Sequence, residues 1–366
     1  MGIKIFEDLR REIVDRNLCN LCGACLAVCT ANNVNALTIH ENRPQYNETT
    51  PQIQKCLECG ICYLICGQIP ELNEVIEAKY GAKPPLGSYK YLTIARTTDL
   101  TIQEKAQDGG IVTSILKYLL EKNFVDGVIV NQSIEDWNSV PKLITSSEEL
   151  VQTAGTRYTA IPAVQELGNY RKLNLENPRL AFVGTPCQVQ TIRKMQALQV
   201  RPGIFVKYLI GLFCMENFDY RTLMKEKLQN ELKINLNEIK KLNIKKNFFI
   251  TLKNGEQIEI PLNELKHLVR ENCHYCTDFT NIYADISVGG IGAPQGYSTV
   301  LIRTEEGGQL FTNLLLERRI EEFTAEPNNV TQTKAKILSL IKKLGQTKYE
   351  NGQKTKSRLN KNGDDR

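Results

Sequence analysis

The segments "CNLCGACLAVCT" (19–30) and "CLECGICYLICG" (56–67) decide the fold of the amino-terminal part of this 366-residue chain. They form an internal repeat, because each contains four cysteines separated by gaps of two, two and three residues. A [4Fe–4S] cluster needs four thiolates, and this spacing supplies three of them from one tight loop. We expect the fourth cysteine of each run to begin a helix that leads toward the other loop, and so to bind the other cluster.

This exchange divides eight cysteines between two clusters. Structural zinc sites favour two CxxC knuckles with a long spacer, so the spacing favours clusters over zinc. Bacterial ferredoxins usually have proline after the fourth cysteine, whereas this chain has Thr30 and Gly67, which leaves the ligand count unchanged. The first predicted cluster has the ligands Cys19, Cys22, Cys25 and Cys66, and the second has Cys56, Cys59, Cys62 and Cys29.

Composition and charge limit the location and partners of the protein. The net charge is +5, and residues 345–366 supply +3 of it with six basic and three acidic residues. The remainder is nearly neutral, which argues against a nucleic-acid surface. No apolar run reaches the length of a membrane span, and the first residues lack the features of a signal peptide. We therefore expect a cytoplasmic protein, at most peripheral on a membrane complex, whose twelve cysteines serve metal or redox chemistry.

The pattern along the chain predicts a small ferredoxin-like domain over residues 1–80, a Pro- and Gly-rich linker over 81–90, and an α/β domain over 91–344. Short apolar strands alternate with helices in the last of these, which predicts a mixed sheet. The polar residues 345–366 are expected to be disordered. The predicted strands are 91–97, 125–131, 179–184 and 205–214, the predicted helices are 111–123 and 187–198, and 248–260 is a predicted hairpin turned at Asn254-Gly255.

Four cysteines lie outside the repeat: Cys187, Cys214, Cys273 and Cys276. Two follow predicted strands, and two form a CxxC. They can bind a third [4Fe–4S] cluster, or the first two can be buried apolar residues and the CxxC a redox pair. Spacing alone leaves both readings open.

Only three histidines are present. We expect His40 and His267 to be structural or exposed, whereas His274 lies inside the CxxC and hence near a site.

Two glycine-containing segments are candidates for cofactor binding. "QDGGIVTSIL" (107–116) places two glycines before a helix, whose free N–H groups would accept a phosphate or the edge of a flavin. "AGTRYTA" (154–160) offers a glycine, a hydroxyl and an arginine. Either segment can equally be a plain turn. "GGIGAPQG" (289–296) runs into Pro294 rather than a helix, so a nicotinamide-binding fingerprint is absent.

Several segments in order resemble the coenzyme F420 hydrogenase/dehydrogenase beta-subunit family. They are "QDGGIVTS", "GTRYTAIPAV", "GTPCQVQ", "GLFCMENF" and "CHYCTDFTNIYADISVGGIGAPQGYSTVLIRTEEG". The resemblance spans roughly residues 12–320, and the amino-terminal double-cluster module makes it greatest to the input subunits of F420H2 dehydrogenases.

The resemblance implies a flavoprotein with FAD beside a third [4Fe–4S] cluster and a pocket for F420 above the flavin. It places the third cluster on Cys187, Cys214, Cys273 and Cys276. The resemblance implies no catalytic side chain, because hydride passes between the flavin and deazaflavin rings. The implied flavin residues are Asp108, Gly109, Gly110, Thr113, Gly155, Thr156, Arg157 and Tyr158, with Pro186 and Gln188 beside the cluster.

The expected function is oxidation of reduced F420, or reduction of F420, through FAD. Flavin exchanges both hydride and single electrons, so it belongs between F420 and the clusters. The expected electron partner is ferredoxin or a larger redox complex, such as a membrane dehydrogenase or a hydrogenase. Two alternatives stay open: a ferredoxin-dependent relative acting on another small molecule, and a wiring protein with a vestigial flavin site.

Overall fold

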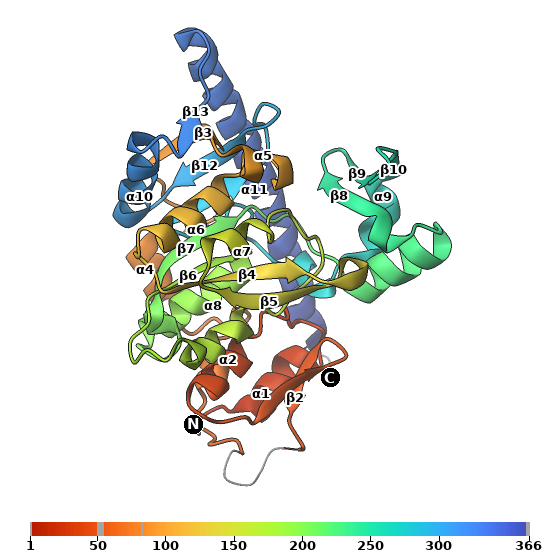
Figure 1. Ribbon diagram of the computed structural model, residues 1–366. Helices are drawn as coiled ribbons and strands as arrows, with labels where there is room; N and C mark the ends of the chain where they lie inside the picture. Colours follow the sequence, from red (N-terminus) through yellow and green to blue (C-terminus); the bar gives the residue numbers. More distant parts are fainter. Residues whose placement is uncertain (1, 50–54, 82, 364–366) are drawn as a thin grey trace.

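The computed structural model describes residues 2–49, 55–81 and 83–363. An eight-stranded sheet forms its centre, in the order β13-β3-β12-β11-β7-β6-β4-β5 (Figure 1). The strands β11, β7, β6 and β4 are mutually parallel, and the other neighbours pair antiparallel. The expected mixed α/β class is confirmed. The strands are β3 (Tyr91–Thr97), β4 (Gly127–Ser133), β5 (Ser139–Ile144), β6 (Leu180–Gly184), β7 (Val206–Leu212), β11 (Ile286–Gly289), β12 (Ser298–Ile302) and β13 (Ile320–Glu322).

Helices cover both faces of this sheet, because its strands are apolar on both sides. In β4, Val128 and Val130 enter the core beneath α6 and α10, whereas Ile129 enters the opposite core beneath α8. This alternation is the period-two pattern of a strand buried on two faces. The predicted strands and the helices at 111–123 and 187–198 are confirmed. The helical elements here are α5 (Leu100–Lys105), α6 (Ile111–Glu121), η3 (Glu135–Trp137), α7 (Ser147–Val151), η4 (Ala163–Leu173), α8 (Pro186–Ala197), η5 (Gly203–Phe205) and α10 (Glu305–Leu316).

The amino-terminal part consists of short helices around one hairpin. Cys29 lies in the last turn of α2 and Cys66 lies beyond the end of α3. The expectation that the fourth cysteine begins a helix is therefore wrong. Each helix starts one residue before the third cysteine of its run. The fourth cysteine is four positions after the third, which is about one helical turn. The elements are α1 (Phe6–Leu9), η1 (Arg10–Val14), α2 (Ala24–Ala31), β1 (Leu37–His40), β2 (Arg43–Tyr46), α3 (Ile61–Leu64) and α4 (Asn73–Tyr80).

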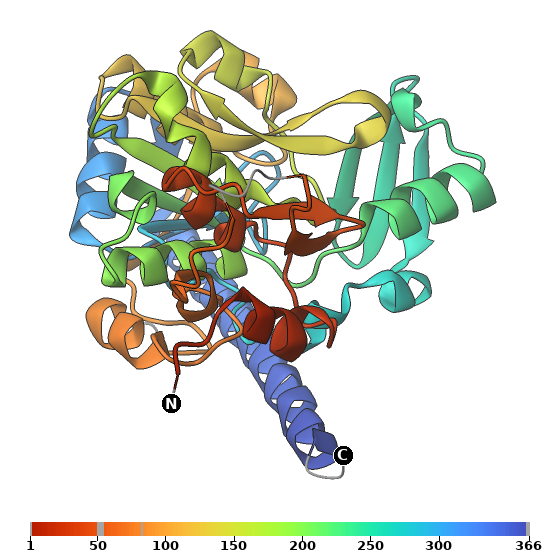
Figure 2. The same cartoon turned by 90° about the horizontal axis from the view of Figure 1, so that it is seen from below.

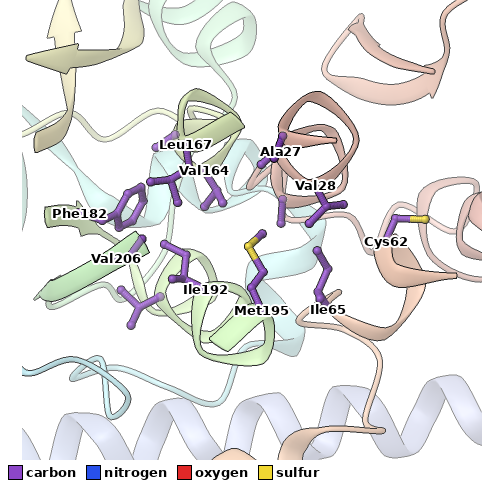
Figure 3. Close-up of a cluster of buried hydrophobic side chains, with 14 of the residues drawn as sticks. Ala27, Val28, Cys62, Ile65, Val164, Leu167, Phe182, Ile192, Met195 and Val206 are labelled. Atoms are coloured by element: carbon purple, nitrogen blue, oxygen red, sulfur yellow. The ribbon is translucent and has the colours of Figure 1, made fainter. Parts of the chain in front are cut away.

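This amino-terminal part shares a hydrophobic core with the large sheet. Figure 3 shows Ala27 of α2 facing Leu167 of η4, with Met195 of α8 nearby. All three side chains are fully buried. The predicted linker, apart from residue 82, has neither helix nor strand, yet it is fixed to the body by buried Arg303, whose Nη1 donates to the Leu86 carbonyl at 3.0 Å. The described residues before the linker, 2–49 and 55–80, are thus packed against the sheet domain.

A second, three-stranded antiparallel sheet projects to one side of the molecule (Figures 1 and 2). It has its own apolar core and contains the predicted hairpin, which turns at Gly255 with a φ of +93°. The hairpin prediction is therefore confirmed. The elements here are η6 (Arg221–Glu231), η7 (Leu236–Glu238), β8 (Ile239–Ile244), β9 (Asn247–Leu252), β10 (Gln257–Pro261), α9 (Leu262–Leu265), η8 (Lys266–Leu268) and η9 (Glu271–Tyr275).

The carboxy-terminal helix α11 (Pro327–Gly363) corrects the expectation of a disordered tail. It passes through the expected boundary at residue 345 and ends at the same end of the molecule as the amino-terminal part (Figure 1). Ile337 and Ile341 bury one side of the helix against β3 and β12. Farther along, the contacts come from Gly345, Lys348 and Gly352, which an apolar periodicity does not reveal. Among the described residues, no helix has the length and apolar character needed to cross a membrane.

Candidate functional site

The two cysteine repeats adopt the same local conformation. Leu21 and Glu58, each two residues after the first cysteine of its run, have positive φ angles of 56° and 53°. In this conformation the N–H of each donates to the sulfur of that first cysteine at 3.4 Å. Left-handed backbone is uncommon for such residues. Its recurrence at equivalent positions shows that the repeat is a repeat of structure as well as of sequence.

Glycine is required where each of these loops turns into its helix. Gly23 and Gly60 have φ angles of +84° and +72°, and they precede α2 and α3. A Cβ on Gly23 would lie 2.8 Å from the Pro162 carbonyl oxygen, and one on Gly60 would lie 2.7 Å from that of Lys4. Both the backbone conformation and the space exclude a side chain.

The first predicted ligand set gathers around one pocket. Cys19, Cys22, Cys25 and Cys66 all line it, together with apolar side chains of η1 and the hairpin. Burial raises the pKa of Cys66 to about 11 and that of Cys22 well above its usual value. The thiols of Cys66 and Cys19 raise the pKa of Cys22 further. The exchange of the fourth cysteine between the two runs thus fits the structure.

The second predicted set lies nearer the surface. Burial raises the pKa of Cys29 to about 12, and the thiols of Cys56 and Cys59 add to the shift. Burial likewise raises the pKa of Cys62 to about 12, with contributions from Cys29, Cys56 and Cys59. Cys59 is exposed, and the side chain of neighbouring Leu57 is 67% exposed. This set therefore reaches the protein surface.

The four dispersed cysteines come together although they are far apart in the sequence. Burial raises the pKa of Cys214, and the nearby thiols of Cys273, Cys187 and Cys276 raise it further. The carboxyl ends of β6 and β7 carry two of these residues, and the η9 segment carries the other two.

Asn281 joins the two strand ends. Its Nδ2 donates to the carbonyls of Gly184 at 2.9 Å and Leu212 at 3.3 Å. The Cys214 N–H donates to the Phe279 carbonyl at 2.9 Å. This hydrogen bond fixes the segment after β7 to the segment that contains Phe279.

The three sets are neighbours, with the buried set in contact range of both of the others. Cys187 of the dispersed set contributes to the raised pKa of Cys22, and Cys62 of the surface set contributes to that of Cys25. Arg270 Nη2 also donates to the Cys19 carbonyl at 3.1 Å, which ties the η9 segment to the first repeat loop. The buried set of Cys19, Cys22, Cys25 and Cys66 accordingly lies between the other two.

Each set offers four thiols, the number that a cubane binds with one thiolate on each iron. Among the described residues, no three Cys, His, Asp or Glu side chains are grouped so that they could hold one metal ion. All twelve cysteines are free thiols. Burial holds most of them neutral, and the positive charge of iron is what would allow them to ionise.

The glycine pair after β3 is explained by its own packing. A Cβ on Gly109 would lie 2.5 Å from the Ala95 carbonyl oxygen, and one on Gly110 would lie 2.7 Å from Thr97 Cγ2. Gly110 has a φ of +70° and begins α6 without a side-chain cap. The first turn of α6, which contains half-buried Thr113, therefore has N–H groups that no side chain caps.

Lysines of the small sheet lie beside this turn. Lys241 Nζ donates to the Gln107 carbonyl at 2.7 Å. Burial raises the pKa of Asp108, while Lys241 and Lys245 oppose that shift. The Asp108 carboxyl group lies against Gly290, where a Cβ would clash with its Oδ2. The loop at 289–296 contains no helix, as its Pro294 predicted, and it links β11 to β12.

The arginine of "AGTRYTA" is hydrogen-bonded within the protein. Arg157 Nε donates to Ser133 Oγ at 2.9 Å, and its Nη1 donates to carbonyls of its own loop, including that of Ala154 at 3.1 Å. Burial lowers the pKa of Arg157 to about 10. Tyr158 is close enough to Asp108 for that carboxyl group to raise its pKa, although burial is the larger cause. The two predicted flavin segments therefore meet at Tyr158, with exposed Gly155 and half-buried Thr156 on the same loop.

The start of α8 connects this loop to the dispersed cysteines. Gln188 is buried, and its Nε2 donates to the Ile161 carbonyl at 2.8 Å. Its Oε1 accepts from the Thr185 N–H at 3.0 Å in a capping box, and Pro186 occupies the first turn. Gln188 and Pro186 thus position Cys187. His40, His267 and His274 are all exposed.

Sequence reasoning missed the buried cations beside the thiols. Lys194 of α8 is fully buried and donates its Nζ to the Cys66 carbonyl at 2.9 Å. Lys348 of α11 is buried beside Cys214. Neither belongs to a motif. The spacing of Gly345 and Gly352 around Lys348 was the only signal in the tail, and a glycine pair is weak evidence of a contact face.

Two protein-family models match consecutive parts of this chain. Residues 92–167 match the amino-terminal family of the coenzyme F420 hydrogenase/dehydrogenase beta subunit, and residues 177–328 match the corresponding carboxy-terminal family. The F subunit of the F(420)H(2) dehydrogenase of Methanosarcina mazei is 31% identical over 91% of this chain and 91% of its own length. That match is too long to omit the second cysteine repeat, at 56–67.

Other relatives match a smaller share of this chain. The beta subunit of the coenzyme F420 hydrogenase of Methanosarcina barkeri is 34% identical over 74% of this chain and 92% of its own length. A chain of the F420-reducing [NiFe] hydrogenase complex from the same organism superimposes with a TM-score of 0.68 at 33% identity, covering 75% of this chain and 93% of that chain. This protein belongs to the coenzyme F420 hydrogenase/dehydrogenase beta-subunit family, a family of F420-dependent oxidoreductases.

Proposed function

We propose that this protein oxidises reduced coenzyme F420, or reduces F420, at a bound FAD and exchanges the electrons with a redox partner through three [4Fe–4S] clusters. The observation that supports the proposal is the proximity of three four-cysteine sets, the last of which includes exposed Cys59. When bound, the flavin would exchange hydride with F420 and single electrons with the clusters. No acid, base or nucleophile of the chain is needed for that exchange.

The work of the chain is to hold these groups and shield them from water. The uncapped first turn of α6, with Lys241 beside it, would hold a phosphate group of the dinucleotide. Gln188 ties the segment around Tyr158 to Cys187, so it would fix the flavin segment relative to the dispersed cysteines. Arg157 holds the backbone of its own loop, so we propose a positioning role for it.

The thiols would provide the rest of the path. Cys187, Cys214, Cys273 and Cys276 would hold the cluster beside the flavin, and the set around Cys66 would hold the middle one. Exposed Cys59 marks the set at which a partner would dock, whether that partner is a ferredoxin or a larger redox complex, with the protein at most peripheral to a membrane.

The test is anaerobic stopped-flow absorbance of the reconstituted protein with reduced F420, NADH and NADPH in turn. We expect reduced F420 to bleach the flavin, and viologen or a ferredoxin to reoxidise the protein. NADH and NADPH should have no effect, because the glycine-rich loop at 289–296 leads into a strand and provides no helix N-terminus for a pyrophosphate. Flavin reduction by NADH and not by reduced F420 would overturn the proposal. Flavin reduction by ferredoxin alone would indicate another small-molecule substrate.

A further inference from the structure

Helix α11 places a buried lysine at the dispersed cysteine set. Lys348 is only 5% exposed, and its Nζ donates to the Cys214 carbonyl. Lysine is ordinarily a cation at neutral pH. Helix α11 therefore brings a positively charged group into contact with the dispersed set.

The position of Lys348 is fixed by a close approach of the helix on either side of it. A Cβ on Gly345, three residues earlier, would lie 2.8 Å from the Pro85 carbonyl oxygen. A Cβ on Gly352, four residues later, would lie 2.7 Å from the Cys276 carbonyl oxygen. Positions three and four apart share one helix face. The two glycines thus bring the helix backbone against the cysteine loop and leave Lys348 directed at it.

Among the described residues, Lys348 forms no ion pair with a carboxylate. Its Nζ is instead hydrogen-bonded to the main-chain carbonyl of Cys214. The nearby Asp278 carboxylate instead accepts the N–H groups of Asn281 at 2.8 Å and Ile282 at 3.0 Å. A buried cation without a paired anion is costly unless another negative group compensates for it. The four thiols supply such a group once they ionise on a cluster.

We infer that Lys348 sets the electrostatic environment of the dispersed cluster and raises its midpoint potential. This inference rests on the third cluster of the proposed function. Reduction adds one electron to the cluster and no proton, so the reduced form is more negative by one charge. A fixed cation in a poorly polarisable interior stabilises the reduced form more than the oxidised form. Net charge and hydrogen bonding near the sulfurs are known determinants of cluster potential.

The experiment is an EPR-monitored redox titration of the anaerobic, cluster-loaded full chain. The dispersed cluster is identified as the signal that disappears in Cys273→Ala. Lys348→Met keeps the length of the side chain and removes its charge, so we expect that signal to titrate at a more negative potential. Lys348→Arg should restore a potential near that of the wild type. Lys342→Met alters an exposed lysine on the same helix and should leave the potential unchanged. The signals of the other two clusters serve as internal controls.

The variant Lys348→Gln separates charge from hydrogen bonding, because its amide still donates to the Cys214 carbonyl. A potential equal to that of the wild type in either neutral variant, with the cluster intact, overturns the inference. If both neutral variants lose the cluster and Lys348→Arg keeps it, the charge is still required at this site. Loss of the cluster in Lys348→Arg as well would assign Lys348 to packing alone and refute the inference. A wild-type protein with only two cluster signals would instead refute the proposed third cluster.

Discussion

The amino-terminal cysteine repeats and the dispersed cysteine set reach comparable arrangements by opposite routes. In the repeats, one loop supplies three of the four cysteines of each predicted set, and Gly23 or Gly60 alone turns that loop into a helix. In the dispersed set, the ends of β6 and β7 and the η9 segment each contribute, and distant groups such as Asn281 and Lys348 hold them. A local site is specified by its own residues, whereas a dispersed site depends on the whole fold.

The largest expected effect follows from the shared core of the two regions. A truncation beginning at Lys83 would remove α2 and expose the apolar faces of η4 and α8, including Leu167 and Met195. Each such side chain contributes about 1.5–3 kcal/mol when buried. We expect the truncated chain to be aggregated or largely unfolded, as measured by circular dichroism and size-exclusion chromatography. A soluble, cooperatively folded product would show that the sheet domain is independent of the repeats.

The next effect concerns the turn of the first repeat loop. In Gly23→Ala the Cβ would meet the Pro162 carbonyl and the residue would keep a left-handed backbone. The backbone penalty alone is about 1–2 kcal/mol. Gly255→Ala is the matched control, because Gly255 has a similar φ of +93° and nothing within 4 Å. Thermal melts should show a larger destabilisation in Gly23→Ala than in the control, together with loss of one cluster signal. Equal melting temperatures in the two variants would mean that the structure around Pro162 accommodates the new Cβ without loss of stability.

A cysteine replacement sharpens the comparison between the two kinds of site. Cys273→Ala should remove about four irons and one cluster signal, and leave both repeat clusters in place. Cys59→Ala is the counterpart at the exposed set and should affect only the surface cluster. Iron content and EPR spectra measure both. Loss of all three signals in Cys273→Ala would show that the repeats depend on the dispersed set for their assembly.

The smallest expected effect is at the flavin segment. Lys241→Met removes the cation beside the first turn of α6, and we expect the Kd for FAD to rise by about tenfold, or roughly 1.4 kcal/mol. Neighbouring Lys240→Met alters an exposed residue and should leave the Kd near that of the wild type. Fluorescence titration of the apoprotein with FAD measures the difference. Gly110 is a poor choice for this test, because its φ of +70° and its contact with Thr97 make any substitution disruptive in itself.

The sequence predicted what is encoded locally. The cysteine spacing predicted both repeats, the apolar runs predicted β3, β4, β6 and β7, and Asn254-Gly255 predicted a hairpin. These features depend on residues a few positions apart, where periodicity and turn chemistry act.

Features that depend on long-range packing were not predictable in the same way. Residues 345–363 look disordered by composition, since the helix contacts the body through two glycines and one lysine there. The internal use of Arg157 depends on Ser133 of a separate strand, and a sequence pattern cannot reveal that its guanidinium is already engaged. The packing of the first 80 residues into the main core was missed because Ala27 and Val28 are too small to signal an interface.

The most direct test of the central claim, that twelve cysteines form three cluster sites, is iron and acid-labile sulfide analysis of the anaerobically reconstituted chain with quantitative EPR. Three [4Fe–4S] clusters require about twelve irons and about twelve sulfides for each chain, distributed over three EPR signals. About eight irons, with the four dispersed thiols still free to react with an alkylating reagent, would contradict the claim for the dispersed set. Stoichiometric zinc in place of iron would contradict it for all three.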